Sequence, residues 1–288
     1  TVRLPPRPVR TRVSENERAP APDALTTPGD PATPGDPATP GDPATPGDPG
    51  RPGRPARADE LTVLSCGDIE LEGRLPWSSN ATFLVKVTTD GRSQPAVYKP
   101  YRGERPLWDF PDGLYHREAA AYQLSVALGW ELVPETVVRT DGPMGIGSVQ
   151  RFVPADFTEH YFTMLEHERH HRALRTIAAF DLVANNADRK SGHCLLGEDG
   201  HIWAIDNALC FHVHPKLRTV IWDFGGEAIP DPLLADLDRL ARDLPDGLRP
   251  FLVDEECEAV IRRAAAVVRH GRFPSPGAER RAYPWPLV

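Results

Sequence analysis

Four charged residues occur in an order and at spacings that suit phosphoryl transfer. Lys99 ends a predicted strand, and Glu118 lies 19 residues later, in the first turns of a predicted helix. Asp188 lies in a loop after another helix, and Asp206 ends a strand 18 residues further on. Transfer of a phosphoryl group from ATP needs a lysine on the phosphates and a glutamate that orients it. It also needs one aspartate at the acceptor hydroxyl and another on Mg²⁺. The ordered set therefore predicts an ATP-dependent kinase.

The segment DLVANNADRKSGHCLL, residues 181–196, places several of these charges between apolar runs. Buried charges are costly unless they are paired or bound to a metal. We therefore expect this loop to face phosphates and a metal ion, with Arg189 or Lys190 stabilising negative charge that develops during transfer. Asp181 lies in the middle of a predicted helix. We interpret it as structural, accepting hydrogen bonds from the backbone of this loop.

The elements that position these residues change in type along the chain. Residues 58–103 alternate apolar and polar side chains and are broken by Gly, Pro, Asn and Asp, which predicts antiparallel strands. TTDGRSQ, residues 88–94, is typical of a hairpin connection. A helix is predicted over residues 113–129, with Gly129 just after its last turn, and two more strands follow.

Residues 154–288 have mainly helical patterns, which are clearest at residues 170–186, 232–244 and 254–271. Strands first and helices later predict an α+β protein of two lobes. The predicted division is a β-rich lobe over residues 59–153, on the side of the ATP phosphates, and a helical lobe over residues 154–288 that carries the catalytic and metal loops.

The first 58 residues have a different composition. The hexad TPGDPA repeats over residues 27–50, and glycine returns every sixth residue rather than every third, which excludes a collagen helix. A segment this rich in Pro, Gly and Asp has little to bury, so we expect disorder with polyproline II character. The tail is a candidate docking segment for a protein partner. Its simpler interpretation is a tolerated low-complexity extension.

Charge and hydropathy exclude several classes of partner. The chain of 288 residues has a formal net charge of −8. Residues 1–58 carry eight arginines and seven acidic residues, a net +1, which leaves −9 for residues 59–288. An acidic body argues against binding to nucleic acid and against adhesion to anionic lipid. The sequence has no apolar run of about 18 residues, so we expect no stable membrane insertion.

The cysteines bear on location. Cys66, Cys194, Cys210 and Cys257 are widely spaced and include no C-x-x-C pair. This pattern argues against a disulfide-stapled fold or a zinc ribbon and favours reduced thiols. The N-terminal residues are rich in Pro and Arg and have no apolar segment of the kind found in secretory signals. Together these features predict a cytoplasmic protein.

Seven segments carry a resemblance to a known family. In collinear order they are SSNATFLV, VYKP, REAAAYQLSVALGWELVPETVV, SVQRFVP, DLVANNADRK, AIDNALCFH and HPKLRTVIWDF. Over residues 71–229 the chain resembles the phosphatidylinositol 3/4-kinase-related branch of the protein-kinase-like fold, in particular the type II phosphatidylinositol 4-kinases and their bacterial relatives. The resemblance implies an ATP site between two lobes, with catalytic and metal-binding loops at NADR and AIDN.

Carried onto this sequence, the resemblance implies a role for each motif. Lys99 would hold the α- and β-phosphates and pair with Glu118. Asp188 would orient the acceptor, and Asp206 would ligate Mg²⁺, for which Mn²⁺ is an alternative. Two backbone segments complete the implied nucleotide site, the phosphate-covering loop and the hinge that contacts adenine: Ser78, Ser79 and Asn80, then Gln150, Arg151, Phe152 and Val153.

The sequence also departs from the family pattern. His193 stands five residues after Asp188, where kinases usually place a metal-binding Asn. A neutral imidazole suits transition metals better than Mg²⁺, so His193 is a candidate metal ligand beside Asp206, and a capping or core role is equally open. The phosphate loop GRLPWSSNA is not a Gly-x-Gly-x-x-Gly loop, Asp-Phe-Gly is absent, and so is the cysteine cluster that lipid-anchors many type II enzymes.

Several functions compete. One is an active kinase whose acceptor is a small molecule, a lipid headgroup or a protein hydroxyl. Another is a nucleotide-binding pseudokinase that acts as a scaffold or regulator, and a third is a relative that transfers AMP. The four charged residues together favour the active kinase, because a scaffold has no chemical need for all of them.

Histidines add one more alternative. HERHH, residues 167–171, matches the H-E-x-x-H helix of zinc proteases, although its surroundings are those of a solvated helix. His212 and His214 are expected to border the acceptor groove instead of binding a metal.

Overall fold

A computed structural model of the chain describes residues 56–76, 80–277 and 282–287. The repeat-rich tail up to residue 55 lies outside the described residues, so its predicted disorder stays a prediction. Helix α1 (Ala56–Cys66) opens the described part. The sequence predicts strands here, and that prediction is wrong. Val63 and Leu64 of α1 pack against the sheet, and this burial outweighs the strand-like alternation of ELTVLSC.

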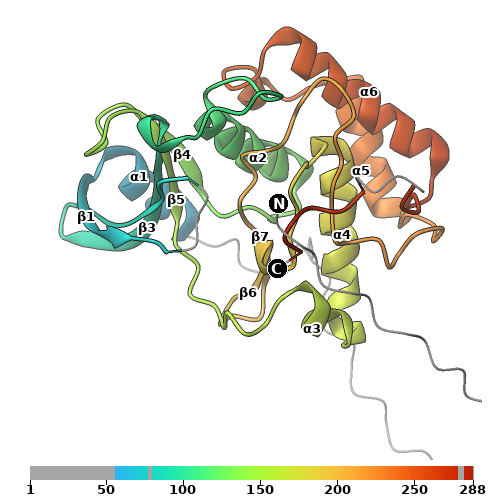
Figure 1. Cartoon of the computed structure of the whole chain (residues 1–288), viewed down its shortest axis with the longest axis horizontal. Helices are drawn as coiled ribbons and strands as arrows, with labels where there is room; N and C mark the ends of the chain where they lie inside the picture. Colours follow the sequence, from blue (N-terminus) through green and yellow to red (C-terminus); the bar gives the residue numbers. More distant parts are fainter. Residues whose placement is uncertain (1–55, 77–79, 278–281, 288) are drawn as a thin grey trace, which may run out of the picture. The chain divides into compact units, whose positions relative to one another are not determined.

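An antiparallel sheet of five strands forms the first part of the fold (Figure 1), with the strand order β1-β2-β3-β5-β4. Its strands are β1 (Asp68–Arg74), β2 (Phe83–Thr89), β3 (Arg92–Pro100), β4 (Thr136–Arg139) and β5 (Gly147–Arg151). Strands β2 and β3 form the predicted hairpin, with Thr89 opposite Arg92. Asp90 and Gly91 both have positive φ, 46° and 76°, as a tight two-residue hairpin turn requires.

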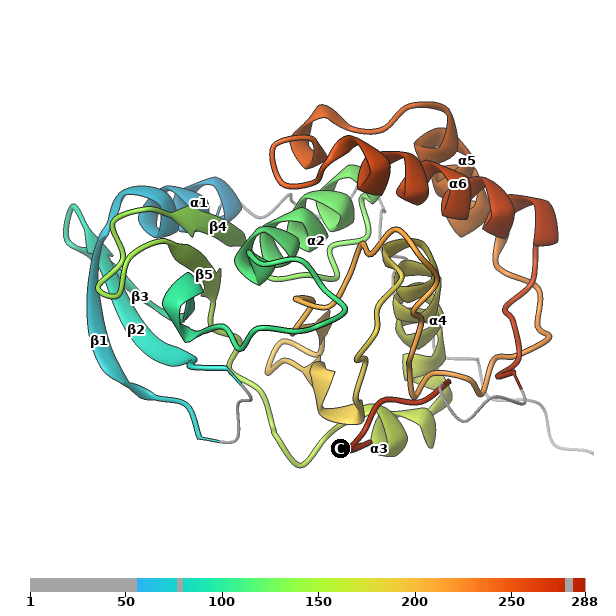
Figure 2. The same cartoon turned by 45° about the horizontal axis from the view of Figure 1, so that its top comes forward.

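The two faces of the sheet have different environments. One face buries five side chains under α1: Val85, Val87, Ala96, Tyr98 and Val149. Because successive side chains of a strand alternate between faces, Lys99 lies on the opposite face, together with Val97. Helix α2 (Leu114–Leu128) contacts β4 and β5 and lies between the sheet and the later helices in both views (Figures 1 and 2).

Both ends of α2 are specified by local chemistry. The Glu104 carboxylate accepts hydrogen bonds from the backbone N–H groups of Gly113, Leu114 and Tyr115, at 3.2, 3.0 and 2.8 Å. A carboxylate there satisfies amides that have no partner within the helix and complements the helix dipole. Gly129 ends the helix with a φ of 69°, as the sequence predicts.

The second part of the fold is mainly helical. It contains α3 (Tyr161–Leu165), α4 (Glu168–Ala184), α5 (Asp231–Arg242) and α6 (Asp254–His270), with a two-stranded sheet of β6 (Cys194–Leu196) and β7 (Ile202–Ala204). The predicted α+β class, with a β-rich lobe followed by a mainly helical lobe, is confirmed. The β lobe holds two helices, α1 and α2, where we predicted one. None of the helices in the described part combines the length and apolar character needed to cross a bilayer.

Helix α2 is bound to the helical part by buried polar contacts. The Arg117 guanidinium pairs with Glu256 of α6 and donates to the carbonyl of Cys210 at 2.5 Å. The indole of Trp130, just after α2, donates to Asp236 of α5 at 2.8 Å. Since removing one partner of a buried ion pair costs about 3–5 kcal/mol, these contacts hold α2 firmly against α5 and α6.

Candidate active site

Lys99 is the point at which the two parts of the fold meet. Its ammonium donates to Glu118 of α2 and to Asp206, just after β7, with 2.8 Å between Nζ and Asp206 Oδ1. Strand β5 pairs closely beside it. A Cβ at Gly147 would lie 2.4 Å from the Lys99 carbonyl oxygen, so glycine permits this approach. The structure therefore brings together three of the four residues predicted for phosphoryl transfer.

The charges of this cluster stabilise one another. Burial alone would disfavour the Lys99 ammonium, but Asp206 and Glu118 outweigh it and raise the pKa of Lys99 above its ordinary value. Lys99 is therefore a cation at neutral pH. Glu118 is only 1% exposed, and its second oxygen accepts the backbone N–H of Asn207 at 3.1 Å. Glu118 thus links α2 to both the lysine and the loop that carries Asp206.

Asp206 is the most accessible acid of the cluster. Its side chain is 45% exposed, and its backbone has a left-handed φ of 56°. Lys99 lowers the pKa of Asp206 below its ordinary value, so the carboxylate stays ionised. A non-glycine residue in this conformation is uncommon and is often found at functional sites. The half-exposed carboxylate can therefore exchange a protein contact for a ligand.

His193 contacts the other oxygen of that carboxylate, with 3.3 Å between His193 Nε2 and Asp206 Oδ2. Burial lowers the pKa of His193 to about 4, so its ring is neutral at physiological pH. The backbone N–H of Lys190 points to His193 Nδ1 at 3.3 Å, which leaves the ring proton on Nε2, where it donates to Asp206. Both ring nitrogens are engaged, so this ring is placed to orient Asp206.

Asp188 lies in the loop after α4 and interacts with Lys190 and Asn186. Lys190 approaches it, with 3.3 Å between Nζ and Asp188 Oδ2, and the side chain of Asn186 accepts its backbone N–H at 2.9 Å. The Asp188 side chain is 26% exposed. Burial raises the pKa of Asp188 to about 6; the charge of Asp206 adds to this, and Lys190 opposes it. A carboxylate with a pKa near neutrality suits proton transfer.

Arg189 has a different environment from the one we predicted. Its side chain is fully buried and forms a two-pronged pair with Asp181, at 2.9 and 3.0 Å. It also donates to the carbonyl of Ile205 at 2.7 Å and to the Asn207 side chain at 2.8 Å. Asp181 neutralises the charge of Arg189. Arg189 thus connects α4 to the loops that contain Asp188 and Asp206, and its guanidinium is used by protein groups instead of being directed at a ligand.

Asp181 has the structural role that the sequence predicts, but with other partners. It accepts from the Arg189 guanidinium and from the Asn186 side chain at 3.1 Å, where we predicted loop backbone. Asn186 and Asn207 are residues that the sequence analysis missed. Their signal was present, because a charge in the apolar helix AAFDLV requires a cationic or amide partner nearby.

The predicted hinge residues begin at the paired end of β5, with Gln150 and Arg151, and continue beyond it. Gln150 donates to the Thr136 hydroxyl at 2.8 Å, and the Phe152 backbone N–H donates to the Pro95 carbonyl at 3.1 Å. The Arg151 guanidinium lies over the ring of Trp203, 4.6 Å from its centroid. Val153 is buried with Leu195 and Trp203 of the small sheet. The segment therefore joins the two parts of the fold through apolar contacts.

The predicted phosphate loop is only partly described. Ser78 and Ser79 lie outside the described residues, so their role stays a prediction. The side chain of Asn80 accepts the backbone N–H of Arg105 at 3.0 Å, which anchors the C-terminal end of this loop.

The H-E-x-x-H match does not form a metal site in the part of the chain that the structure describes. No group of three or more His, Cys, Asp or Glu side chains is placed there to hold a metal ion. His167 caps the start of α4, and His171 Nε2 lies 2.7 Å from the carbonyl oxygen of Leu165. His212 is engaged with Phe110, at 5.1 Å between ring centroids.

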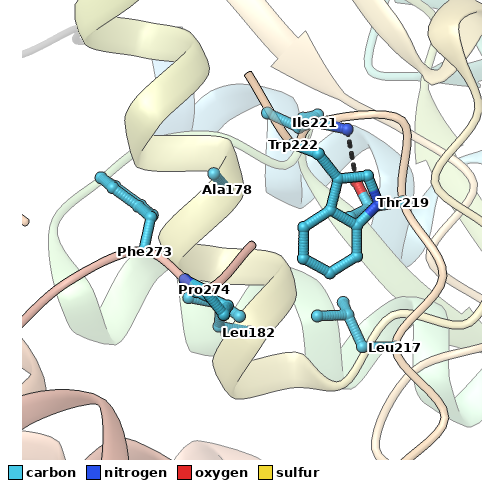
Figure 3. A pocket seen from close by; sticks show the side chains of 8 residues that line it. All are labelled: Ala178, Leu182, Leu217, Thr219, Ile221, Trp222, Phe273 and Pro274. Atoms are coloured by element: carbon cyan, nitrogen blue, oxygen red, sulfur yellow. Dashed lines mark hydrogen bonds between the residues drawn. The ribbon is translucent and has the colours of Figure 1, made fainter. Parts of the chain in front are cut away.

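Two cavities in the described part of the chain are lined by residues other than Lys99, Asp188 and Asp206. Eight residues line one of about 10 Å³ (Figure 3): Ala178, Leu182, Leu217, Thr219, Ile221, Trp222, Phe273 and Pro274. That volume is enough for about one water molecule. A larger cavity of about 300 Å³ lies between residues 111–117 and 250–256, beside the Arg117–Glu256 pair.

Three solved structures show similarity to the chain. Hydra Fam20, solved with sugar, has a TM-score of 0.47 at 15% identity and covers 75% of this chain and 88% of that chain. The Golgi casein kinase has a TM-score of 0.45 at 16% identity, with 78% and 80% covered. The Helicobacter pylori proinflammatory kinase CtkA has a TM-score of 0.44 at 12% identity, with 73% and 94% covered.

Sequence comparison gives a nearer relative. No protein-family model matches the chain. Protein Rv2133c of Mycobacterium tuberculosis (strain ATCC 25618 / H37Rv) is 40% identical over 269 residues, which cover 80% of this chain and 96% of the relative. At this identity and coverage, the chain belongs to the family of protein Rv2133c.

Proposed function

We propose that the protein is an ATP-dependent phosphotransferase, a kinase. The observation that carries the proposal is the Lys99 ammonium held between Glu118 of one part of the fold and Asp206 of the other. This arrangement orients a permanent cation and leaves an ionised, half-exposed carboxylate beside it. Phosphoryl transfer relies on positioning and on charge stabilisation, which these groups provide.

In this proposal each residue acts on a different part of the nucleotide. Lys99 contacts phosphate oxygens, and Glu118 fixes the direction of its ammonium. Adenine contacts the sheet face that carries Lys99, where Leu84 and Val97 are paired across β2 and β3 and remain only half-buried. Val153 and Leu195 supply apolar surface from the hinge and the small sheet.

The donor chemistry fits a hard divalent cation. Mg²⁺ in proteins is usually held by one or two carboxylates together with substrate phosphates, and Asp206 is a half-exposed carboxylate that can take this part. When bound, Mg²⁺ or Mn²⁺ neutralises charge on the phosphates. We assign His193 to orienting Asp206, since its Nδ1 accepts an amide proton and its Nε2 faces the carboxylate.

On the acceptor side, Asp188 accepts the proton of the incoming hydroxyl. Its pKa of about 6 leaves it mostly ionised at neutral pH and still basic enough for this work. Lys190, 3.3 Å from the Asp188 carboxylate, is the cation that stabilises charge during transfer. Arg189 holds both loops in place through Asp181 and Asn207.

Within kinases we propose the phosphatidylinositol 3/4-kinase-related type, on the strength of the sequence segments around VYKP, NADRK and AIDN. The acceptor hydroxyl is a separate question. A lipid headgroup, a small molecule and a protein side chain all present a hydroxyl that Asp188 could deprotonate.

Labelled ATP tests the proposal directly. The protein is incubated with γ-labelled or α-labelled ATP and Mg²⁺ or Mn²⁺, against itself, lipid vesicles and a cell extract. Transfer of the γ-label alone supports a kinase, and transfer of the α-label indicates AMP transfer. Transfer of neither label, with ATP still raising the melting temperature, indicates a nucleotide-binding scaffold. Absence of any stabilisation by ATP overturns the proposal.

A further inference from the structure

The segment at residues 282–287 is hydrogen-bonded to the loop that contains Asp188. The backbone N–H of Ser191, three residues after Asp188, donates to the carbonyl of Leu287 at 2.9 Å. The Ser191 side chain is fully buried, and its hydroxyl has no hydrogen-bond partner. A chain segment from the end of the sequence therefore lies directly against the proposed acceptor side, and both views place it near β6 (Figures 1 and 2).

A second set of contacts binds the same segment to the loop after Asp206. The carbonyl of Ala282 accepts the Thr219 backbone N–H and the Trp222 indole N–H, each at 3.1 Å. The rings of Trp222 and Tyr283 meet edge to face, with centroids 6.5 Å apart. Thr219 is itself paired with Arg189 in a parallel bridge. The segment thus spans the two loops that would flank an acceptor.

The segment is held mainly by its backbone. Of its side chains only Pro284 is buried, whereas Tyr283, Trp285 and Leu287 are exposed, Trp285 to 88%. A segment with few buried apolar contacts lies at the low-stability end of a fold and opens locally at small cost. The weak attachment distinguishes it from helices α4 and α6, whose apolar faces form the core.

The contacts of residues 282–287 fall on one side of the site. They are made with Ser191, Thr219 and Trp222, which belong to the loops after Asp188 and Asp206. The contacts given for this segment in the described part of the chain do not involve Lys99 or Glu118.

We propose that residues 282–287 form a strap that competes with the phosphoryl acceptor for the surface made by Ser191, Thr219 and Trp222. This inference rests on the proposed kinase function. The closed strap covers the acceptor side and leaves the nucleotide side open, so ATP binds in both states. Release of the strap frees two backbone N–H groups and an indole N–H for an incoming acceptor.

Two neighbouring residues allow a matched test in the full chain. Pro284→Asp places a charge at the buried position and should detach the strap. Trp285→Asp introduces the same charge at the exposed neighbour and serves as the control. Amide hydrogen exchange at Ser191 and Thr219 measures the strap directly. ADP release from ATP with Mg²⁺ or Mn²⁺ measures transfer, with water as the acceptor.

We expect Pro284→Asp to raise exchange at both amides and ADP release at least threefold, while the ATP-induced rise in melting temperature is unchanged. Trp285→Asp should leave all three as in the parent. Trp222→Phe, which removes the indole donor and keeps a smaller aromatic ring, should raise exchange and ADP release about twofold. It decides the matter if Pro284→Asp fails to fold.

The outcomes separate the strap from the kinase proposal. Faster exchange with unchanged or reduced ADP release, in a protein still stabilised by ATP, overturns the strap and leaves the kinase proposal standing. Unchanged exchange in both Pro284→Asp and Trp222→Phe also overturns the strap. If ATP stabilised none of the variants, both the kinase proposal and the proposed competition between the strap and the acceptor would be overturned.

Discussion

Two ion pairs, Arg189–Asp181 and Lys99–Asp206, lie within the candidate site and differ in burial and in backbone conformation. Arg189 and Asp181 are fully buried, and further protein groups share their hydrogen bonds. Lys99 and Asp206 form a pair of similar length, but Asp206 is half-exposed and in a left-handed backbone conformation. The Arg189–Asp181 pair therefore cannot exchange a partner for a ligand, whereas the Lys99–Asp206 pair can.

The difference teaches how to assign roles to charged residues in such a site. A charge whose hydrogen-bonding capacity is used up by the protein holds structure. A charge that keeps an accessible oxygen or proton, beside a fixed counter-charge, can act on a ligand. By this criterion we propose that Arg189 and Asp181 are structural and that Lys99, Asp188 and Asp206 are functional.

The sharpest way to test this comparison is to break the buried pair. Arg189→Met leaves Asp181 without its counter-ion in a dry environment. We expect the free energy of unfolding to fall by about 3–5 kcal/mol, measured by denaturant titration. Lys190→Met is the matched control at the next position, with an effect of about 1 kcal/mol or less because Lys190 pairs with a partly exposed acid. Equal losses in both variants would contradict the assignment.

Asp188→Asn should have a smaller effect on stability, and one of opposite sign. The pKa of Asp188 in the folded protein, about 6, lies above its value of about 3.9 in an unfolded chain. The folded state therefore binds the proton more tightly, and the free energy of unfolding falls as pH rises from about 4 to about 6. The Asn variant lacks this fall and should be more stable at pH 7 by about 1–2 kcal/mol, compared by thermal unfolding at pH 4 and pH 7.

The same substitution separates transfer from binding. Asp188→Asn should reduce transfer by about 10²- to 10⁴-fold and leave the ATP-induced rise in melting temperature intact. In the parent, kcat/KM should decline below pH 6 as Asp188 takes up its proton. A parent profile that is flat from pH 5 to pH 7 would rule out Asp188 as the proton acceptor.

Asp206→Asn should change stability by less than about 1 kcal/mol, because the lost contact is half-exposed and Lys99 keeps Glu118. Asparagine also tolerates the left-handed backbone at this position. Even so, the metal-dependent part of ATP stabilisation should disappear, as measured by thermal shift with ATP in the presence of Mg²⁺ and of EDTA. If Mg²⁺ still added to the ATP-induced stabilisation of this variant, the metal would bind elsewhere, and the proposed functional role of Asp206 would be contradicted.

The smallest effect on metal use is expected at His193. If the ring orients Asp206, His193→Asn should lower the free energy of unfolding by about 0.5–1.5 kcal/mol through one lost hydrogen bond. The ratio of rates with Mg²⁺ and Mn²⁺ should stay within about threefold of the parent. A marked shift toward Mg²⁺ would instead identify the imidazole as a ligand, since an amide oxygen is the harder donor.

Features set by local chemistry were predictable from the sequence. Asp90-Gly91 indicates a two-residue turn, and Gly129 ends α2, because both depend on which residues tolerate a positive φ. The order Lys99, Glu118, Asp188 and Asp206 was informative for a similar reason. A given chemistry requires given side chains on given kinds of element.

Features set by packing were not predictable in the same way. Residues 58–66 alternate like a strand but belong to α1, because Val63 and Leu64 find a complementary sheet face that no local pattern encodes. Arg189 looked like a ligand for phosphate because it adjoins Asp188. Its burial depends on Asp181, eight residues earlier, and on Asn207, 18 residues later. The sequence lists such partners without indicating which of them meet.

The contacts of Arg117 with Glu256 and of Trp130 with Asp236 have a consequence for motion. They make α2 part of the same cooperative unit as α5 and α6, although it lies earlier in the chain than β4 and β5. Amide exchange in α2 should therefore follow that of the helices and be slower than exchange in β1 and β2. We therefore expect Glu118 to keep its position when β1 and β2 open and close locally.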